Sequence, residues 1–108
     1  MGLVHIFGNK PIPQILDFLR VYREWDYSLK TISEATGLSF RTLQRIMPQL
    51  VKEGLILKTR TVGKSKMYII NKKSTIVKKL DELALEADVE YARSLRKRPR
   101  EIVAPVKA

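Results

Sequence analysis

Residues 28–70 read SLKTISEATGLSFRTLQRIMPQLVKEGLILKTRTVGKSKMYII, and this stretch decides the fold. Ser28 belongs to the residue types that cap helix N-termini, and Gly37 tolerates the left-handed backbone conformation that commonly ends a helix. Ser39 can cap a second helix directly after that glycine. The stretch therefore begins with two helices that are separated by a tight turn.

The apolar spacing indicates which faces of these two helices pack together. Residues 29–36 place Leu29, Ile32 and Ala35 on one face. Pro48 lies inside the second helix, where it removes one backbone hydrogen bond, so we expect a kink there or a helix that ends at Met47. The second helix continues to Gly54 and repeats apolar residues at three- and four-residue spacing, at Leu43, Ile46, Met47, Leu50 and Val51.

The remainder of the stretch predicts a β-hairpin with a basic tip. Residues 55–61 and 66–71 have the composition of strands, and Gly63 allows the chain to turn sharply between them. Lys64 and Lys66 lie on either side of Ser65 at the tip. The chain thus combines two helices, a tight turn and a basic hairpin within about 43 residues.

This combination resembles the helix-turn-helix and wing of winged-helix transcription regulators. The resemblance rests on the turn glycine, on GLI at 54–56, on the basic tip and on MYIIN at 67–71, and it covers residues 12–71. It implies a mainly α fold with a small β-hairpin (α+β), with a three-helix core, a two-stranded wing and a long C-terminal helix. It also implies that the second helix of the motif enters the major groove of duplex DNA.

The family pattern assigns DNA contacts to the exposed N-terminal part of that helix and to the wing. Arginine pairs with guanine and glutamine with adenine, so Arg41, Gln44 and Arg45 are the predicted base readers. Two roles are equally open for Phe40: contact with a thymine methyl group, or packing beneath the turn. The wing is predicted to position the protein on phosphates. The full predicted DNA-binding set is Ser39, Phe40, Arg41, Thr42, Gln44, Arg45, Arg60, Lys64, Ser65 and Lys66.

The charge of the chain favours a polyanionic partner. Its 108 residues include 21 Lys and Arg against 11 Asp and Glu, which gives a formal net charge of +10. DNA, RNA and an anionic membrane surface would all suit this balance. Between residues 39 and 66 there are seven basic residues and a single acid, Glu53, whereas ordinary solvated surfaces mix the two signs.

Other functions find little support in the sequence. The chain has no Cys and a single His, His5, so disulfides and Cys- or His-based metal sites have no ligands. It lacks paired carboxylates, a nucleophile with a base and a phosphate-binding loop, so we expect no enzyme activity, no cofactor and no metal. It has no apolar run of the ~20 residues that a membrane span needs and no export signal. We therefore expect a cytoplasmic, nucleoid-associated protein.

The segment before the motif predicts a short strand or arm at residues 3–7 and then a helix. Two prolines, Pro11 and Pro13, suit the first turn of a helix, and apolar spacing from Ile12 predicts that this helix runs to about Glu24. Residues 25–27 then form a connection, in which we expect Trp25 to be part of the core or of an interface.

The segment after the motif predicts one long helix. From about Lys72 or Ser74 to Arg98 the chain contains neither Gly nor Pro, and Pro99 is expected to stop the helix. A helix of ~25 residues here would be about 37 Å long. A helix longer than its domain must bury its apolar stripe elsewhere, and pairing with a second copy is the simplest solution; folding back on its own domain is the alternative. The predicted dimer interface is Ile76, Leu80, Leu83, Ala87, Tyr91 and Leu95.

Three segments and one leading function follow. Residues 1–71 form the DNA-binding domain, residues 72–98 a dimerisation helix and residues 99–108 a flexible basic tail. We expect a sequence-specific double-stranded DNA-binding transcription regulator that acts as a homodimeric repressor or autoregulator. The alternative is an architectural or plasmid-partition protein that coats DNA with little sequence preference, and RNA stays open as a partner.

Overall fold

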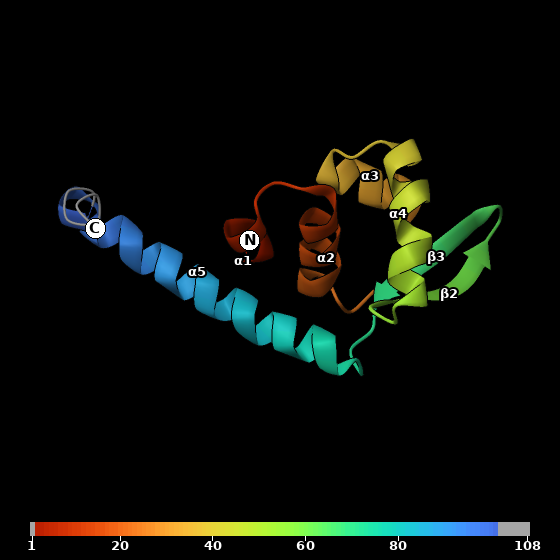
Figure 1. Cartoon of the computed structure of the whole chain (residues 1–108). Coiled ribbons are helices and arrows are strands. Elements are labelled where there is room, and N and C mark those ends of the chain that lie inside the picture. Colours follow the sequence, from red (N-terminus) through yellow and green to blue (C-terminus); the bar gives the residue numbers. More distant parts are fainter. Residues whose placement is uncertain (1, 102–108) are drawn as a thin grey trace.

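The computed structural model describes residues 2–101, with side chains as far as Ser94. The described chain forms five helices and a three-stranded antiparallel sheet with strand order β1-β3-β2. This is an α+β fold with a long C-terminal helix, as the sequence predicts. In chain order (Figure 1) the elements are α1 (Gly2–Phe7), α2 (Pro11–Val21), β1 (Tyr27–Ser28), α3 (Leu29–Thr36), α4 (Phe40–Lys52), β2 (Ile56–Val62), β3 (Ser65–Ile70) and α5 (Thr75–Glu101).

Helices α3 and α4 begin and end where their local sequence directs them. The Ser28 hydroxyl oxygen accepts the Thr31 N–H at 3.2 Å and so caps α3, while Gly37 ends that helix with φ of +80°. Ser39 caps α4 in the same way, accepting the Thr42 N–H at 3.2 Å. Each cap satisfies a backbone donor that has no partner within its own helix. These predicted helix boundaries are confirmed.

Side chains of α3 hold the turn between the two helices in place. The Ser33 hydroxyl donates to the Leu38 carbonyl at 2.6 Å. The Thr36 hydroxyl donates to the Ile32 carbonyl at 2.7 Å and accepts the Leu38 N–H at 3.2 Å. Two of these hydrogen bonds join Leu38 in the turn to the end of α3, and the third fixes the Thr36 hydroxyl that one of them uses.

Pro48 does not end α4, which continues to Lys52. The four buried side chains of the helix lie on both sides of the proline in sequence, and Pro48 itself is exposed. A proline on the solvent side costs one backbone hydrogen bond, while the apolar face keeps its contacts with the core. The expected continuation of the helix is therefore observed, and an end at Met47 is not. The buried residues are Leu43, Ile46, Met47 and Leu50.

The hairpin β2–β3 turns at Gly63 and Lys64, the two residues between the paired Val62 and Ser65. Gly63 has φ of +62°, which a residue with a side chain adopts only at a cost. Beyond Ile56, every residue of β2 is exposed, so the hairpin projects away from the rest of the chain (Figure 1). It is held at its base, where Tyr68 and Ile70 of β3 are buried as predicted.

The sheet has a third strand that the sequence does not reveal. Tyr27 pairs with Tyr68 and Ser28 with Met67, so β1 lies on the free edge of β3. Tyr27 was expected to belong to a connection, whereas Ser28 was expected to cap α3, which it does. A strand of two residues has no alternation to detect, and only its pairing with a distant strand defines it.

The core lies where α2, α3, α4 and the base of the hairpin meet. Ile15 from α2, Ile32 from α3 and Leu43 from α4 are all completely buried, and Ile56 at the start of β2 joins them. Helix α2 is shorter than expected, because it ends at Val21 rather than near Glu24. The connection that follows leaves Trp25 71 % exposed, so this residue is not part of the core.

Residues 2–7 form a helix, not the short strand or arm that the sequence predicts. The carboxylate of Asp17, in α2, accepts the N–H groups of Leu3 at 3.1 Å and Val4 at 3.0 Å. These donors lie in the first turn of α1, where a helix has no internal acceptors. Because the cap comes from a residue 14 positions away, it leaves no local signal in the sequence.

Asp17 also begins a chain of charges that leads to α5. Its side chain is 0 % exposed and receives a hydrogen bond from Arg20 at 2.9 Å. Arg20 lies 3.5 Å from the Asp81 carboxylate of α5, and Arg23 donates to the same carboxylate at 2.8 Å. The network thereby joins three helices through charges that are mostly removed from water.

Helix α5 runs alongside α1 and past the compact part of the chain (Figure 1). Its 27 residues correspond to about 40 Å, and it continues through Pro99, which was expected to stop it. Proline removes a single backbone donor and does not by itself end a helix. Val77 and Ala84 are buried against the rest of the chain, and Gly2 comes so close to Ala84 that a Cβ atom would lie 2.4 Å from its backbone oxygen.

The predicted stripe of α5 is consequently divided. Leu80 packs against the core, and the ring of Tyr91 stacks on that of His5 with centroids 4.2 Å apart. Ile76 and Leu83 remain 58 % and 45 % exposed. Part of the helix has therefore folded back on its own domain, and part of the stripe is still uncovered. The side chain of Leu95 and the tail residues 102–108 lie outside the described residues.

We predict that Asp17→Ala lowers the free energy of unfolding by about 3–5 kcal/mol, because it leaves the buried Arg20 and two helix N–H groups without their acceptor. Urea unfolding followed by circular dichroism measures this change. Glu34→Ala, at an exposed acid of α3, should change stability by no more than about 0.5 kcal/mol. A loss of similar size in both variants would contradict the role given to Asp17.

Candidate nucleic-acid interface

One face of α4 carries polar and basic side chains into solvent, opposite its buried apolar face. Arg41, Gln44, Arg45 and Lys52 are all exposed, and Pro48 lies among them. Successive residues of a helix turn by about 100°, so these positions share one side of α4. The three residues predicted to read bases are therefore accessible together.

Ser39 and Thr42, also predicted to contact DNA, are hydrogen-bonded to each other. The Ser39 hydroxyl donates to the Thr42 hydroxyl at 3.0 Å and accepts the Thr42 backbone N–H. Both contacts serve the cap of α4. Their part in the site is therefore to begin the helix at the place where its basic residues follow.

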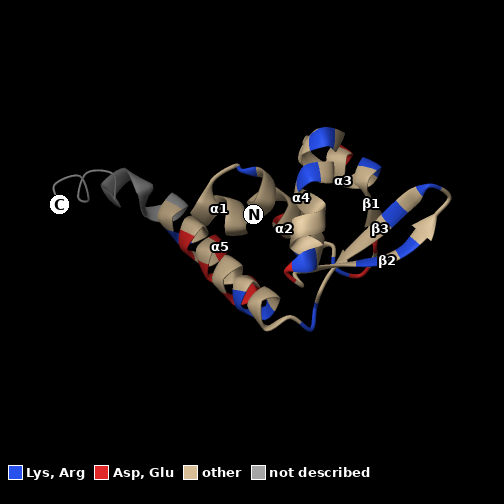
Figure 2. Cartoon of the chain, turned by 45° about the vertical axis from the view of Figure 1, so that its right-hand side comes forward, with Lys and Arg blue, Asp and Glu red and all other residues tan. Residues whose placement is uncertain are grey.

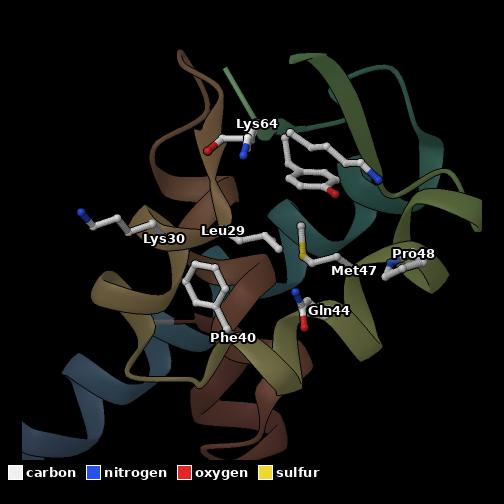
Figure 3. A pocket seen from close by; sticks show the side chains of 10 residues that line it. Leu29, Lys30, Phe40, Gln44, Met47, Pro48 and Lys64 are labelled. Atoms are coloured by element: carbon white, nitrogen blue, oxygen red, sulfur yellow. The ribbon is translucent and has the colours of Figure 1, made fainter. Parts of the chain in front are cut away.

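A pocket of about 480 Å³ lies between α4, the start of α3 and the hairpin (Figure 3). We call it the hairpin pocket. Of the predicted residues, Phe40, Gln44 and the three tip residues 64–66 are brought together here, although they come from separate elements. The lining residues are Leu29, Lys30, Phe40, Gln44, Met47, Pro48, Lys64, Ser65, Lys66 and Tyr68.

The floor of the hairpin pocket is apolar and its rim is basic. Met47 and Tyr68 are 1 % and 7 % exposed and belong to the core as well as to the pocket. Burial raises the pKa of the Tyr68 phenol, so the group stays neutral at physiological pH. Lys64 and Lys66 line the pocket from the hairpin and Lys30 from α3. Such a pocket suits a ligand that presents negative charge to the rim.

Lys30 is a site residue that the sequence reading missed. It is the second residue of α3, is exposed, and lines the hairpin pocket opposite the hairpin tip. The available signal was a basic residue two positions after a serine cap, where a helix carries positive potential of its own. Only the packing of α3 beside the hairpin shows that this lysine joins the other two.

The basic residues of this face are free of acidic partners. In the part of the chain that the structure describes, no ion pair involves Lys30, Arg41, Arg45, Lys64 or Lys66. Figure 2 shows basic residues on α3, α4 and the hairpin, whereas many of the acidic residues lie along α5. Charges left uncompensated on one side create a field that attracts polyanions.

Arg60 is the exception among the predicted basic contacts. Its guanidinium donates to both carboxylate oxygens of Asp26, at 2.9 and 3.2 Å, and Thr59 donates to the same carboxylate. A β-bulge at Thr59 brings these two neighbours to Asp26 together. The pair joins the hairpin to the connection that follows α2. In this structure Arg60 is therefore committed to positioning the hairpin.

The Asp26–Arg60 pair changes the acidity of both groups. The hydrogen bond from Arg60, then that from Thr59, lowers the pKa of Asp26 below its ordinary value of 3.8. In return, the hydrogen bond to Asp26 and its charge raise the pKa of Arg60. Both shifts favour the charged forms, so the pair persists into acid solution.

Arg45 lies on the other flank of α4 from Gln44. It lines a second and larger pocket, enclosed by α1, α2, α4 and α5, and not the hairpin pocket. Arg41 lines neither of the two pockets. The three predicted base readers therefore share the exposed face of α4 but differ in what surrounds them.

No group of three or more His, Cys, Asp or Glu side chains among the described residues could hold a metal ion. None of the helices in residues 2–101 is both long enough and apolar enough to cross a membrane.

Comparison of the chain with protein-family models, with curated proteins and with solved structures gives no match.

We predict that the Asp26 carboxyl titrates with a midpoint below 3.8 and that Arg60→Ala moves this midpoint upward. Because the folded-state pKa is lowered, the pair stabilises the fold above pH 3.8 and loses this effect as the pH falls through the lowered pKa. Carboxyl-carbon NMR measures the midpoint. Lys58→Ala, on the same strand, should leave it nearly unchanged, and an unchanged midpoint in Arg60→Ala would disprove the coupling.

Proposed function

We propose that this chain is a winged helix-turn-helix protein that binds double-stranded DNA in a sequence-specific manner, as a transcription regulator. The observation that carries the proposal is the juxtaposition of an unpaired basic face on α4 with a lysine-rimmed pocket against the hairpin. A sugar-phosphate strand that passes between α4 and the hairpin would meet three lysines from two elements.

The dimensions of duplex DNA suit this arrangement. Its major groove is about 12 Å wide and admits one α-helix. With α4 in that groove, the projecting hairpin reaches the neighbouring backbone. The uncovered length of β2 supports this role, because a hairpin that packed on its own domain would bury one of its faces.

Within this proposal the residues divide into readers and positioners. Arg41 and Gln44 are placed for base edges, because long side chains on the exposed face of a helix reach the floor of the groove. Lys30, Lys64 and Lys66 neutralise phosphates, which carry affinity but little sequence information. Arg60 keeps the hairpin in register through Asp26.

An architectural protein that coats DNA is the second candidate. One observation favours it: all three cations of the hairpin pocket are lysines, which suit phosphate contact better than base reading. The net charge of +10 points the same way. Gln44 favours the regulator, since its amide adds no charge for coating the backbone and can pair with adenine.

We predict that the full-length chain retains a small set of genomic fragments at about 150 mM salt, a concentration that suppresses sequence-independent binding. On a duplex derived from these fragments, Arg41→Ala should cost about 1–3 kcal/mol, but much less on a random duplex, because only the selected site offers the matching base. Fluorescence anisotropy titrations measure both affinities.

Lys52→Ala is the matched control for Arg41→Ala, since Lys52 lies at the far end of the same helix. It should weaken both duplexes alike. Even coverage of the genome, together with equal losses for Arg41→Ala on both duplexes, would favour the architectural protein.

We also predict that Lys30→Ala and Lys64→Ala each reduce the slope of log K against log salt by about one on any duplex, because each removes one phosphate contact. Titrations at four or more salt concentrations measure the slope. Lys79→Ala, an exposed lysine of α5, should leave it unchanged. Loss of slope in Lys79→Ala but not in Lys30→Ala would place the DNA elsewhere.

A further inference from the structure

The second pocket, of about 730 Å³, has no part in the proposed DNA contacts. We call it the helix pocket, because α1, α2, α4 and α5 surround it. Apart from Lys10, Arg45 and Gln49, its lining is apolar or proline. The lining residues are Leu3, Phe7, Lys10, Pro11, Ile12, Pro13, Leu16, Arg45, Ile46, Gln49 and Leu80.

The apolar surface of the helix pocket continues onto its rim and along α5. Phe7 and Ile12 line the pocket and are 53 % and 39 % exposed. On α5, Ile76 and Leu83 flank the lining residue Leu80 at four- and three-residue spacing, so the three share one side of the helix. A continuous apolar surface of this kind on a protein marks an interaction site more often than chance.

The chain cannot cover this surface itself by turning α5. Ala84 already packs against Gly2 without room for one more methyl group, and Asp81 is held by Arg20 and Arg23. The stacking of Tyr91 on His5 adds a further contact on the same side of α5. Rolling the helix to bury Ile76 and Leu83 would break all of these contacts, so α5 itself cannot cover the surface.

The charges beside the apolar surface indicate what its occupant is. Glu82, Glu86 and Glu90 are exposed and four residues apart, so they form an acidic ridge beside Leu83 on α5. Within this ridge Glu90 already pairs with Arg93 at 2.7 Å, so Glu82 and Glu86 are the acids offered to a partner. The helix pocket carries the cations Lys10 and Arg45. In a chain of net charge +10, the acidic ridge is complementary in sign to this pocket. A second copy supplies both the apolar stripe and the acids that the pocket lacks.

We infer that two copies associate by docking the Ile76–Leu83 stripe of each α5 into the helix pocket of the other. The pocket and the stripe lie next to each other on one chain. Two copies related by a twofold axis beside this surface would therefore each place their stripe in the pocket of the other, as a self-complementary interface requires. The inference extends the proposed function, since a dimer presents two copies of α4 to DNA. The inference also assigns Arg45 to the dimer interface, so Arg41 and Gln44 remain as the residues proposed to read bases.

Cross-linking between introduced cysteines tests which surfaces meet. The chain contains no cysteine of its own, so only the introduced positions can react. Ile12→Cys is mixed with Leu83→Cys, or with Leu85→Cys as the control, without DNA and in the presence of a bismaleimide. Leu85 is 66 % exposed and lies on the other side of α5. A tag on one variant separates heterodimers from homodimers by mass. We expect efficient heterodimer formation with Leu83→Cys and at least about tenfold less with Leu85→Cys.

Equal yields with the two α5 cysteines would overturn the inference. So would efficient cross-linking of Leu83→Cys to itself combined with none to Ile12→Cys, because that result indicates α5 pairing with α5 alone. Both outcomes leave the DNA proposal standing, since no DNA is present. Conversely, dimers cross-linked as expected by a chain that retains no DNA would overturn the proposed function and not the interface.

Sedimentation velocity on intact chains provides the second measurement. Leu83→Asp should raise the dimer dissociation constant at least about tenfold, and Leu85→Asp should not. Arg45→Glu should weaken the dimer, and adding Glu86→Arg to that variant should restore part of the loss if the charges meet across the interface. Circular dichroism confirms that each variant is folded. A wild-type chain that stays monomeric at all concentrations would overturn the inference in favour of a small ligand or another protein.

Discussion

The carboxylate of Asp17, completely buried where α1, α2 and α5 meet, is the group on which the outer part of this structure depends. It supplies the acceptors for the first turn of α1 and the counter-charge for Arg20, which in turn lies beside Asp81 of α5. A buried charge is tolerated only when it is paired and hydrogen-bonded, so the Asp17 carboxylate restricts how these helices can be arranged.

The position of α5 determines which surfaces the molecule shows to its surroundings. Because α1 occupies the Val77–Ala84 side of the helix, the Ile76–Leu83 side and the acidic ridge are left outside. The basic residues of α3, α4 and the hairpin lie apart from that acidic ridge (Figure 2). The basic face of α3, α4 and the hairpin and the acidic ridge of α5 are thus separate surfaces, and each can attract a different partner.

The candidate nucleic-acid interface shares residues with the core. Met47 and Tyr68 fill the core and also form the floor of the hairpin pocket, so neither can move without disturbing the packing. The hairpin has a second attachment at Asp26, through Arg60 and Thr59. Lysines on such a frame are held at defined separations while their ends remain free, which suits contact with regularly spaced phosphates.

The sequence by itself determined the features that depend on neighbouring residues. Helices α3 and α4, the caps at Ser28 and Ser39 and the glycine that ends α3 all follow from hydrogen bonds and periodicity within a few positions. The hairpin follows from Gly63 in the same way. The accessible base-reading candidates could also be predicted, since the buried face of α4 leaves its opposite face to solvent.

Only the tertiary structure decided the features whose partners are far along the chain. Helix α1 needs an acceptor from Asp17, β1 needs the edge of β3, and Arg60 meets a carboxylate 34 residues away. The spacing of apolar residues on α5 identified a stripe, but Gly2 and Ala84 selected a neighbouring side of the helix for burial. These outcomes depend on which surfaces meet first and pack most closely, and local periodicity carries no information about that choice.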